Sequence, residues 1–130
     1  MFMPLNEVIT KQPLHPAWDQ KKVNNLIQSM KKNGWNGQPL LFANEYLING
    51  SHRFGALELI FESYDDIQWG NKLIDVMDIE DLPIPVIDLG EYLTNEQIDE
   101  ALDFSDEDER ISFLSDLLPE NIFNILSLEQ

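Results

Sequence analysis

The chain has 130 residues, of which 43% are apolar and none is cysteine. This length supports one domain with its own core, without disulfides or a structural metal. The lack of cysteine excludes disulfide frameworks, cysteine–zinc sites, iron–sulfur clusters and thiol catalysis. The first residues do not form an export signal, and no apolar run approaches the roughly 18 residues of a membrane-spanning helix. We therefore expect a soluble, cytoplasmic protein that does not enter a membrane.

The charge of the chain is large and unevenly distributed. Eight basic and 24 acidic residues give a formal net charge of −16. Residues 1–60 hold six basic and four acidic residues, whereas residues 61–130 hold two basic residues, Lys72 and Arg110, and 20 acidic ones. Nucleic-acid binding requires cations that displace the counterions of the phosphates, so the second half is expected to repel nucleic acid. An acidic surface can instead attract a basic protein or simply keep the molecule soluble.

The chain begins with a predicted extended segment, a loop and a helix. Residues 2–9 predict a short strand, and residues 12–16 predict a loop because neither proline fits inside a helix. Asp19 can cap the helix that follows, in which apolar residues recur at helical spacing, and Gly34 is the expected stop.

A hairpin and a second helix are expected next. The apolar runs 39–43 and 46–48 are separated by two turn-forming residues, which predicts a β-hairpin. Residues 49–51 break the strand, and the apolar residues that follow predict a largely buried helix with Ser51 as its N-cap. This segment therefore predicts a strand, a glycine turn and a helix.

The remaining chain predicts an insertion, a strand and acidic helices. Residues 63–82 fit neither a single helix nor a single strand and are interpreted as an insertion. Residues 84–89 predict a strand, which a proline places at a strand start or a sheet edge. Thr94 and Gln97 have the spacing of a capping box, Ser105 is expected to open a second helix, and Pro119 fits the first position of a third. Apolar stripes predict that these helices pack on the core or on each other. The expected organisation is a core over residues 1–90 and an acidic helical extension over residues 91–130.

The segment Asn49-Gly50-Ser51-His52-Arg53 has the chemistry of an anion site. Gly50 permits an unusual φ, the first N–H groups of the helix point outward, and the three residues after it add a hydroxyl and further donors. Arg53 is the only arginine in the first 109 residues, and its planar fork suits two simultaneous phosphate contacts. A glycine and a serine before a helix are also ordinary turn and cap chemistry, so both interpretations stay open.

From Leu5 to about Leu89, the order of these elements resembles the ParB/sulfiredoxin superfamily. The matching pieces are His15-Pro16, the helix end Ser29-Met30-Lys31-Lys32-Asn33-Gly34, the run Gln38-Pro39-Leu40-Leu41-Phe42, the hairpin, Ile48-Asn49-Gly50-Ser51-His52-Arg53-Phe54-Gly55-Ala56, and Ile84-Pro85-Val86-Ile87-Asp88. The resemblance implies an α+β fold with a small mixed-sheet core, to which the acidic helices are an addition. It also implies that nucleotide phosphates are held by Asn49, Gly50, Ser51, His52 and Arg53, with His15 beside them.

Departures from the superfamily narrow the expected activity. Sulfiredoxins carry a cysteine where Ser51 stands, and a hydroxyl cannot replace a thiolate in sulfinic-acid repair. Partition proteins continue into a basic DNA-binding region, whereas here acidic helices follow. The free-serine kinases of the superfamily have an acidic residue near the first helix, where Asp19 lies, but Pro16-Ala17-Trp18 replaces the more acidic stretch.

Two functions of different classes follow from the sequence. The first is binding of a nucleoside di- or triphosphate with magnesium, with ATP- or CTP-dependent phosphoryl transfer or hydrolysis if the protein is an enzyme. The catalytic candidates are then Asp19 and His52, and Asp88 is the candidate magnesium ligand. The second is a non-catalytic, immunity-like interaction protein whose acidic half captures a basic partner.

Overall fold

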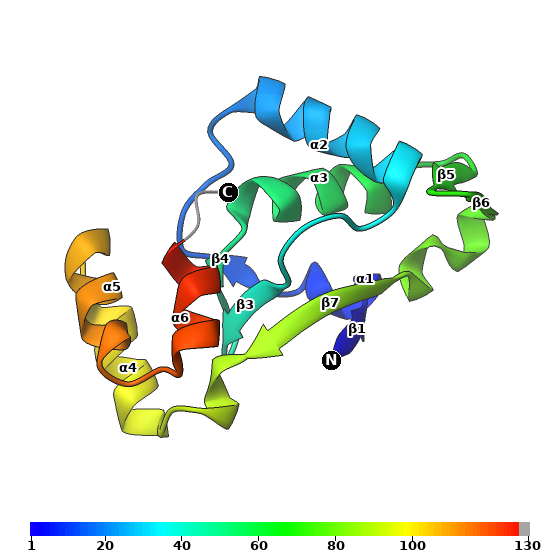
Figure 1. Ribbon diagram of the computed structural model, residues 1–130. Coiled ribbons are helices and arrows are strands. Elements are labelled where there is room, and N and C mark those ends of the chain that lie inside the picture. Colours follow the sequence, from blue (N-terminus) through cyan, green and yellow to red (C-terminus); the bar gives the residue numbers. More distant parts are fainter. Residues whose placement is uncertain (128–130) are drawn as a thin grey trace.

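The computed structural model describes residues 1–127 and contains a mixed sheet with helices on both faces (Figure 1). Its five strands lie in the order β1-β7-β3-β4-β2. They are β1 (Phe2–Pro4), β2 (Gln12–Pro13), β3 (Leu40–Ala43), β4 (Tyr46–Asn49) and β7 (Pro83–Asp88). β7 is antiparallel to β1 and parallel to β3, while β4 is antiparallel to β3 and parallel to β2. The predicted α+β fold is confirmed.

The first face of the sheet is covered by α1 (Leu5–Val8), α2 (Gln20–Asn33) and α3 (Ser51–Phe61). Leu40, Phe42 and Leu47 of the central strands pack into the apolar cluster on this side. The predicted start of α2 is confirmed, because Asp19 Oδ1 accepts from the Lys22 N–H at 3.1 Å. Its predicted stop is confirmed too, since Gly34 ends the helix with φ 71°.

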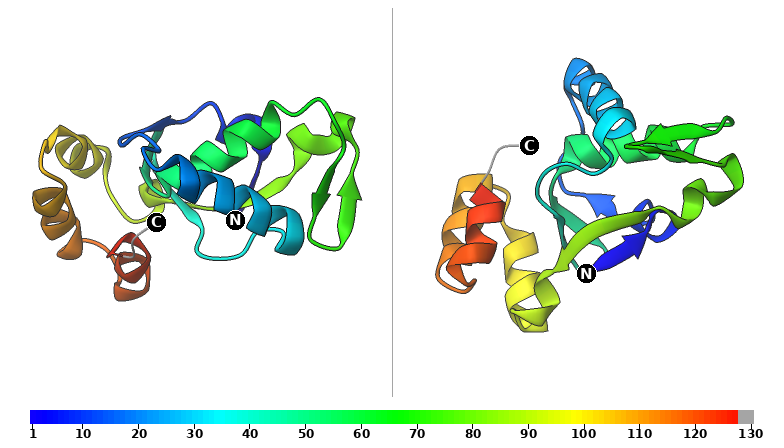
Figure 2. Two further views of the ribbon diagram at one scale, coloured as in Figure 1. Left: turned by 90° about the horizontal axis from the view of Figure 1, so that it is seen from above. Right: turned by 45° about the vertical axis from the view of Figure 1, so that its right-hand side comes forward.

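The second face is covered by α4 (Asn95–Asp103), α5 (Glu107–Ser115) and α6 (Glu120–Ser127), which form a separate layer in Figure 2. Leu41, Ala43 and Ile48 pack into the apolar cluster of these helices. Successive residues of a strand point to opposite faces, so all four residues of β3 are buried. Apolar packing therefore joins the acidic extension to the sheet; its last three predicted residues, 128–130, lie outside the described residues.

The prediction of an extended segment over residues 2–9 is wrong beyond Pro4. Residues Leu5–Val8 form α1, a single helical turn, and both Leu5 and Val8 are fully buried. Helical spacing places these two residues on one face, and both pack into the core. Burial, which depends on contacts distant in the sequence, therefore decides this element.

Strand β7 lies between β1 and β3 rather than at the edge of the sheet. The prediction from Pro85 of a strand start or a sheet edge is therefore wrong, because the strand begins at Pro83 and Pro85 lies within it. The Val86 N–H donates to the Met1 carbonyl, so the Pro85 nitrogen faces the β3 side. Pairing with β3 begins only at Val86, which lies opposite Leu40. Pro85, which has no N–H, therefore comes just before the first residue pair of the β3–β7 ladder.

Residues 63–82 form a hairpin and a short 3₁₀ helix. The hairpin consists of β5 (Ile67–Trp69) and β6 (Lys72–Ile74), and the 3₁₀ helix η1 spans Val76–Asp81. Gly70, with φ 63°, forms the turn between the two strands. Asp75 accepts from the Met77 N–H and Asp66 from the Val76 N–H, so both carboxylates hold the start of η1.

The starts of the C-terminal helices agree with the predictions to within one residue. The predicted capping box of α4 is confirmed, with reciprocal hydrogen bonds between Thr94 and Gln97. Asp106 rather than Ser105 caps α5, because its carboxylate accepts from the N–H groups of Asp108 and Glu109. Pro119 immediately precedes α6. Within residues 1–127, no helix has the length and apolar character needed to cross a bilayer.

Candidate functional site

The turn between β4 and α3 is shaped by Gly50. This residue has φ 98° and ψ 30°, and it takes the N-cap position predicted for Ser51. A Cβ atom at this position would lie 2.5 Å from Leu40 Cδ2. A residue with a side chain would therefore meet both an unfavourable backbone conformation and a collision with the core. Glycine is thus required where the chain leaves the sheet and enters α3.

The first turn of α3 presents hydrogen-bond donors that the protein does not use. The first intrahelical bond runs from the Phe54 N–H to the Gly50 carbonyl. The N–H groups of Ser51, His52 and Arg53 precede it and have no intrahelical acceptor. Within the part of the chain that the structure describes, the Ser51 hydroxyl makes no hydrogen bond. The positive end of the helix dipole adds to these donors, which together suit an anion.

Arg53 is held beside this turn by the loop that follows α2. Its Nη1 donates to the Gln38 carbonyl at 2.8 Å, and its Cζ lies 5.5 Å from the centroid of the Trp35 ring. Gly37 has φ 129°, and a Cβ there would collide with the guanidinium, 2.8 Å from Cζ. Within residues 1–127, no carboxylate forms an ion pair with Arg53. Burial lowers the pKa of Arg53, because desolvation disfavours the charged form.

His52 and Asp19 are neighbours, as the predicted site required. His52 is only 4% exposed, and its Nε2 accepts from the Asp19 N–H at 3.3 Å. Trp18, which is 79% exposed, meets the imidazole edge-on with ring centroids 5.6 Å apart. The buried Nδ1 has no partner among the described residues. In this arrangement the imidazole positions the Trp18–Asp19 loop, while the Asp19 carboxylate caps α2.

Asn49 links the turn to the acidic extension. Its Oδ1 accepts from the Gly50 N–H and its Nδ2 donates to the Ile125 carbonyl of α6, both at 3.0 Å. Both ends of the amide, predicted as a phosphate contact, are therefore engaged within the protein. The same bonds fix the direction in which the chain enters Gly50.

His15 also contacts the extension. Its Nε2 lies within hydrogen-bond distance of Glu107 Oε2 on α5, and Arg110 Nη1 donates to the same oxygen. The structure thus places this predicted phosphate contact against the second helical layer. Together with Asn49, it makes two polar links between the candidate site and the acidic helices.

Asp88 is not brought to the turn. On β3, the register partner of Asp88 is Phe42, whereas that of Asn49 is Leu41. Strand β3 thus lies between β7, which carries Asp88, and β4, which carries Asn49. Asp88 Oδ1 accepts from the Gly90 N–H at 2.8 Å and so caps the short 3₁₀ helix η2 (Leu89–Glu91). In residues 1–127, no three His, Asp or Glu side chains converge as a metal-binding group would.

Sequence reasoning did not anticipate the loop that holds Arg53. The only local signal for it was a pair of glycines, Gly34 and Gly37, on either side of Trp35. It also missed Arg110, which is 5% exposed and donates to the carbonyls of Ala101 and Phe104. These contacts join residues whose pairing leaves no periodic pattern in the sequence.

Comparison of the chain with models of protein families, with curated proteins and with solved structures finds no match. The function is therefore argued from the residues of this chain.

Proposed function

We propose that the first turn of α3 binds the phosphates of a nucleoside di- or triphosphate. The observation that carries the proposal is the environment of Arg53: a guanidinium partly withdrawn from water, held beside a helix N-terminus, with no carboxylate partner in the described residues. A phosphate would supply the missing negative charge. It would also accept from the unused donors of Ser51 and from the backbone N–H groups.

The proposal agrees with the arrangement that the ParB/sulfiredoxin resemblance implies. Phosphate contacts are assigned to the backbone of Ser51, His52 and Arg53, to the Ser51 hydroxyl and to the Arg53 guanidinium. The Trp18 ring lies exposed at one side of the turn and offers a surface on which a base can stack. Asp88 does not fit a magnesium site at this turn, so no step is assigned to a protein-held metal ion.

If the site also catalyses phosphoryl transfer or hydrolysis, Asp19 is the candidate acid or base, because its backbone lies against His52 at the turn. Its Oδ1 is used as the α2 cap, and its backbone N–H is tied to His52. Substitution by asparagine would keep the cap while removing the charge. Turnover lost with binding intact in Asp19→Asn would assign the catalytic function to this carboxylate.

Calorimetric titration with ATP, ADP, CTP and GTP tests the binding proposal. Arg53→Ala should weaken the nucleotide that binds the wild type by about tenfold or more, because a charge-assisted hydrogen bond is lost. Arg53→Lys should recover only part of the affinity, since an ammonium lacks the planar fork. Lys32→Gln is the charge-matched control, because Lys32 is exposed and is not a partner of Arg53 in the described hydrogen bonds and ring contacts. Unchanged affinity in Arg53→Ala would refute the proposal.

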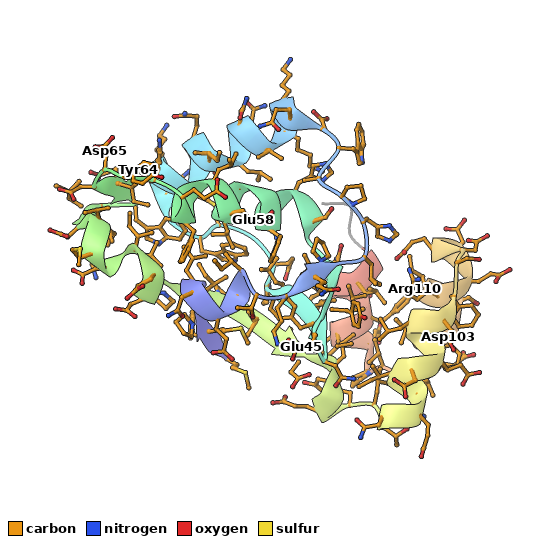
Figure 3. The ribbon with its side chains drawn as sticks, turned by 180° about the vertical axis from the view of Figure 1, so that it is seen from behind. Glu45, Glu58, Tyr64, Asp65, Asp103 and Arg110 are labelled. Atoms are coloured by element: carbon orange, nitrogen blue, oxygen red, sulfur yellow. The ribbon has the colours of Figure 1, made fainter. Side chains whose placement is uncertain are left out.

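A second candidate function is capture of a basic protein by the extension. The favouring observation is that acidic side chains such as Asp99, Asp103 and Asp108 are exposed, whereas Arg110, the only basic residue after Lys72, is buried. Figure 3 shows Asp103 and Arg110 on the helices of the extension. Binding of this kind should weaken steeply with salt and survive Arg53→Ala. Reversal of these three carboxylates to lysine should abolish it, and binding that persists would refute this function.

A further inference from the structure

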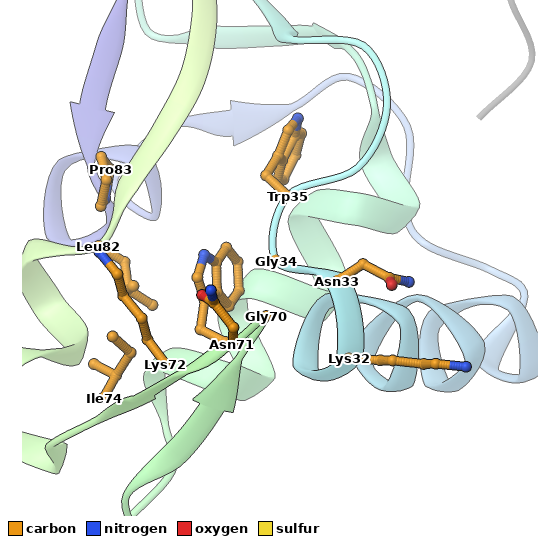
Figure 4. A pocket seen from close by; sticks show the side chains of 11 residues that line it. Lys32, Asn33, Gly34, Trp35, Gly70, Asn71, Lys72, Ile74, Leu82 and Pro83 are labelled. Atoms are coloured by element: carbon orange, nitrogen blue, oxygen red, sulfur yellow. The ribbon is translucent and has the colours of Figure 1, made fainter.

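A cavity of about 500 Å³ opens on the side of the molecule formed by the end of α2, the β5–β6 hairpin and the start of β7 (Figure 4). The indole rings of Trp35 and Trp69 and the apolar side chains of Ile74, Leu82 and Pro83 contribute to its wall. This volume is within the range of small-molecule sites, and an apolar, aromatic wall is typical of them.

The cavity is built by a close backbone contact. A Cβ atom on Gly70 would lie 3.3 Å from the Gly34 nitrogen, and one on Gly34 would lie 3.4 Å from Trp69 Nε1. Both glycines have positive φ, a conformation that disfavours a side chain, at the point where the hairpin turn and the end of α2 meet. This contact fixes the position of Trp69 relative to the loop that carries Trp35. Both rings therefore line the same cavity.

The charge of the cavity is opposite to that of its surroundings. No acidic residue lines it, although residues 61–130 carry 20. Lys72 is the only basic residue between Arg53 and Arg110, and within residues 1–127 it forms no ion pair. Lys32 also lines the cavity, but Figure 4 shows its side chain pointing away, whereas that of Lys72 reaches toward Leu82.

The nearby carboxylates have other functions. Asp66 and Asp75 hold the start of η1 through the N–H groups of Val76 and Met77. Neither lines the cavity. Lys72 is thus left as a cation without an ion-pair partner among the described residues, in a cavity that two indole rings also line.

We propose that this cavity binds a planar organic anion, namely an aromatic ring that carries a carboxylate. The ring would pack against Trp35 and Trp69, where aromatic groups pair favourably, and the carboxylate would contact the Lys72 ammonium. Trp35 links this cavity to the α3 turn, because Arg53 Cζ lies 5.5 Å from the centroid of its ring. Lys72 and Trp69 contact neither Gly50 nor Arg53 in the described hydrogen bonds and ring contacts, so these two residues distinguish binding in the cavity from nucleotide binding.

Titration with 2-naphthoate and its neutral analogue 2-naphthamide tests this inference. The chain has three tryptophans, so the indole N–H signals in a ¹⁵N-correlation spectrum report separately on Trp18, Trp35 and Trp69 once each is assigned by a Phe substitution. Naphthoate should shift the signals of Trp35 and Trp69 and leave that of Trp18 in place. Its Kd should be about threefold or more below that of naphthamide, as expected for one partly exposed ion pair.

Two variants of equal charge complete the experiment. Lys72→Gln should make naphthoate and naphthamide bind equally, whereas Lys21→Gln, on an exposed residue of α2 that does not line the cavity, should keep the preference for the anion. Equal affinities in the wild type, or equal losses in the two variants, would overturn the proposal. A shift of Trp35 without Trp69 would also overturn it, because the probe would then lie on the Arg53 side. Absence of any shift at the solubility limit of naphthoate would refute the site as well.

Discussion

The two arginines of this chain have opposite environments. Arg110 lies between α4 and α5 and is satisfied by its own chain: it donates to the carbonyls of Ala101 and Phe104 and pairs with Glu107 (Figure 3). Arg53 lies at the first turn of α3 with one carbonyl and one aromatic ring as partners. Arg110 therefore stabilises the extension through its hydrogen bonds, whereas Arg53 keeps unused donors at the candidate site.

This difference separates a stabilising arginine from one available to a ligand. A buried cation whose hydrogen bonds are complete contributes to folding, and removing it leaves its acceptors unpaired. A partly desolvated cation without a counter-charge contributes less, because its burial opposes its contacts. Identical substitutions at the two positions should therefore have different consequences.

The largest effect is expected for Arg110→Met. This substitution keeps the apolar stem but leaves the carbonyls of Ala101 and Phe104 without their donor and removes the cation paired with Glu107, so the free energy of unfolding should fall by about 2–4 kcal/mol. Urea denaturation measures the loss. Nucleotide affinity of the folded protein should be unchanged. A loss below about 0.5 kcal/mol would remove the distinction between the two arginines.

Gly50→Ala should have the next largest effect. The positive φ and the collision with Leu40 Cδ2 together should lower the free energy of unfolding by about 2 kcal/mol. Gly90→Ala is the control, because its added Cβ would meet only the end of the Asp88 side chain, at 3.0 Å. If both variants unfold at the same urea concentration, the backbone of the turn does not depend on glycine.

The elements that could be predicted from the sequence are those with local signals. Asp19, Gly34 and the Thr94 capping box act through hydrogen bonds within one turn of their own helices, and all three took their predicted places. Residues Leu5–Val8 did not, because a single buried turn depends on the core that receives it. Local chemistry therefore predicts where helices begin and end better than it predicts short segments.

In the candidate site, too, local signals predict one part of the structure and fail to predict another. The position of the turn at Gly50 follows from a strand, a glycine and a helix in succession. The partners of its side chains do not: His15 meets Glu107, Asn49 meets Ile125 and Arg53 meets Gln38, across separations of 92, 76 and 15 residues. No pattern in one sequence encodes such pairs, and they decide which predicted residues have unused donors.

Arg53→Met should lower the free energy of unfolding by no more than about 1 kcal/mol without ligand, since the lost contacts are offset by relief of desolvation. In thermal-shift measurements, the same nucleotide concentration should raise the Tm of the wild type by more than that of the variant, because the variant binds more weakly. The loss of stability in Arg53→Met can then be compared directly with that in Arg110→Met. A destabilisation as large as that of Arg110→Met would show that Arg53 is chiefly a structural residue.

The smallest effect concerns Glu58, which extends the comparison to carboxylates. Glu107 has Arg110 as a partner, whereas Glu58 on α3 has none among the described residues and faces Glu62 one turn away (Figure 3). Partial burial and then repulsion from Glu62 raise the pKa of Glu58 above its ordinary value of 4.5. The folded protein therefore binds this proton more tightly than the unfolded chain does, and the charged form is destabilising at neutral pH.

Glu58→Gln should therefore unfold at a higher urea concentration than the wild type at pH 7, with a gain of about 0.5 kcal/mol because the site is well solvated. The gain should shrink as the pH falls through the raised pKa of the folded state, and vanish below the ordinary value, where Glu58 is protonated in both states. Glu62→Gln should recover only the part of the gain that comes from repulsion. A gain that stays constant from pH 7 to below 4.5 would show that amide packing, rather than charge, separates Glu58 from Glu107.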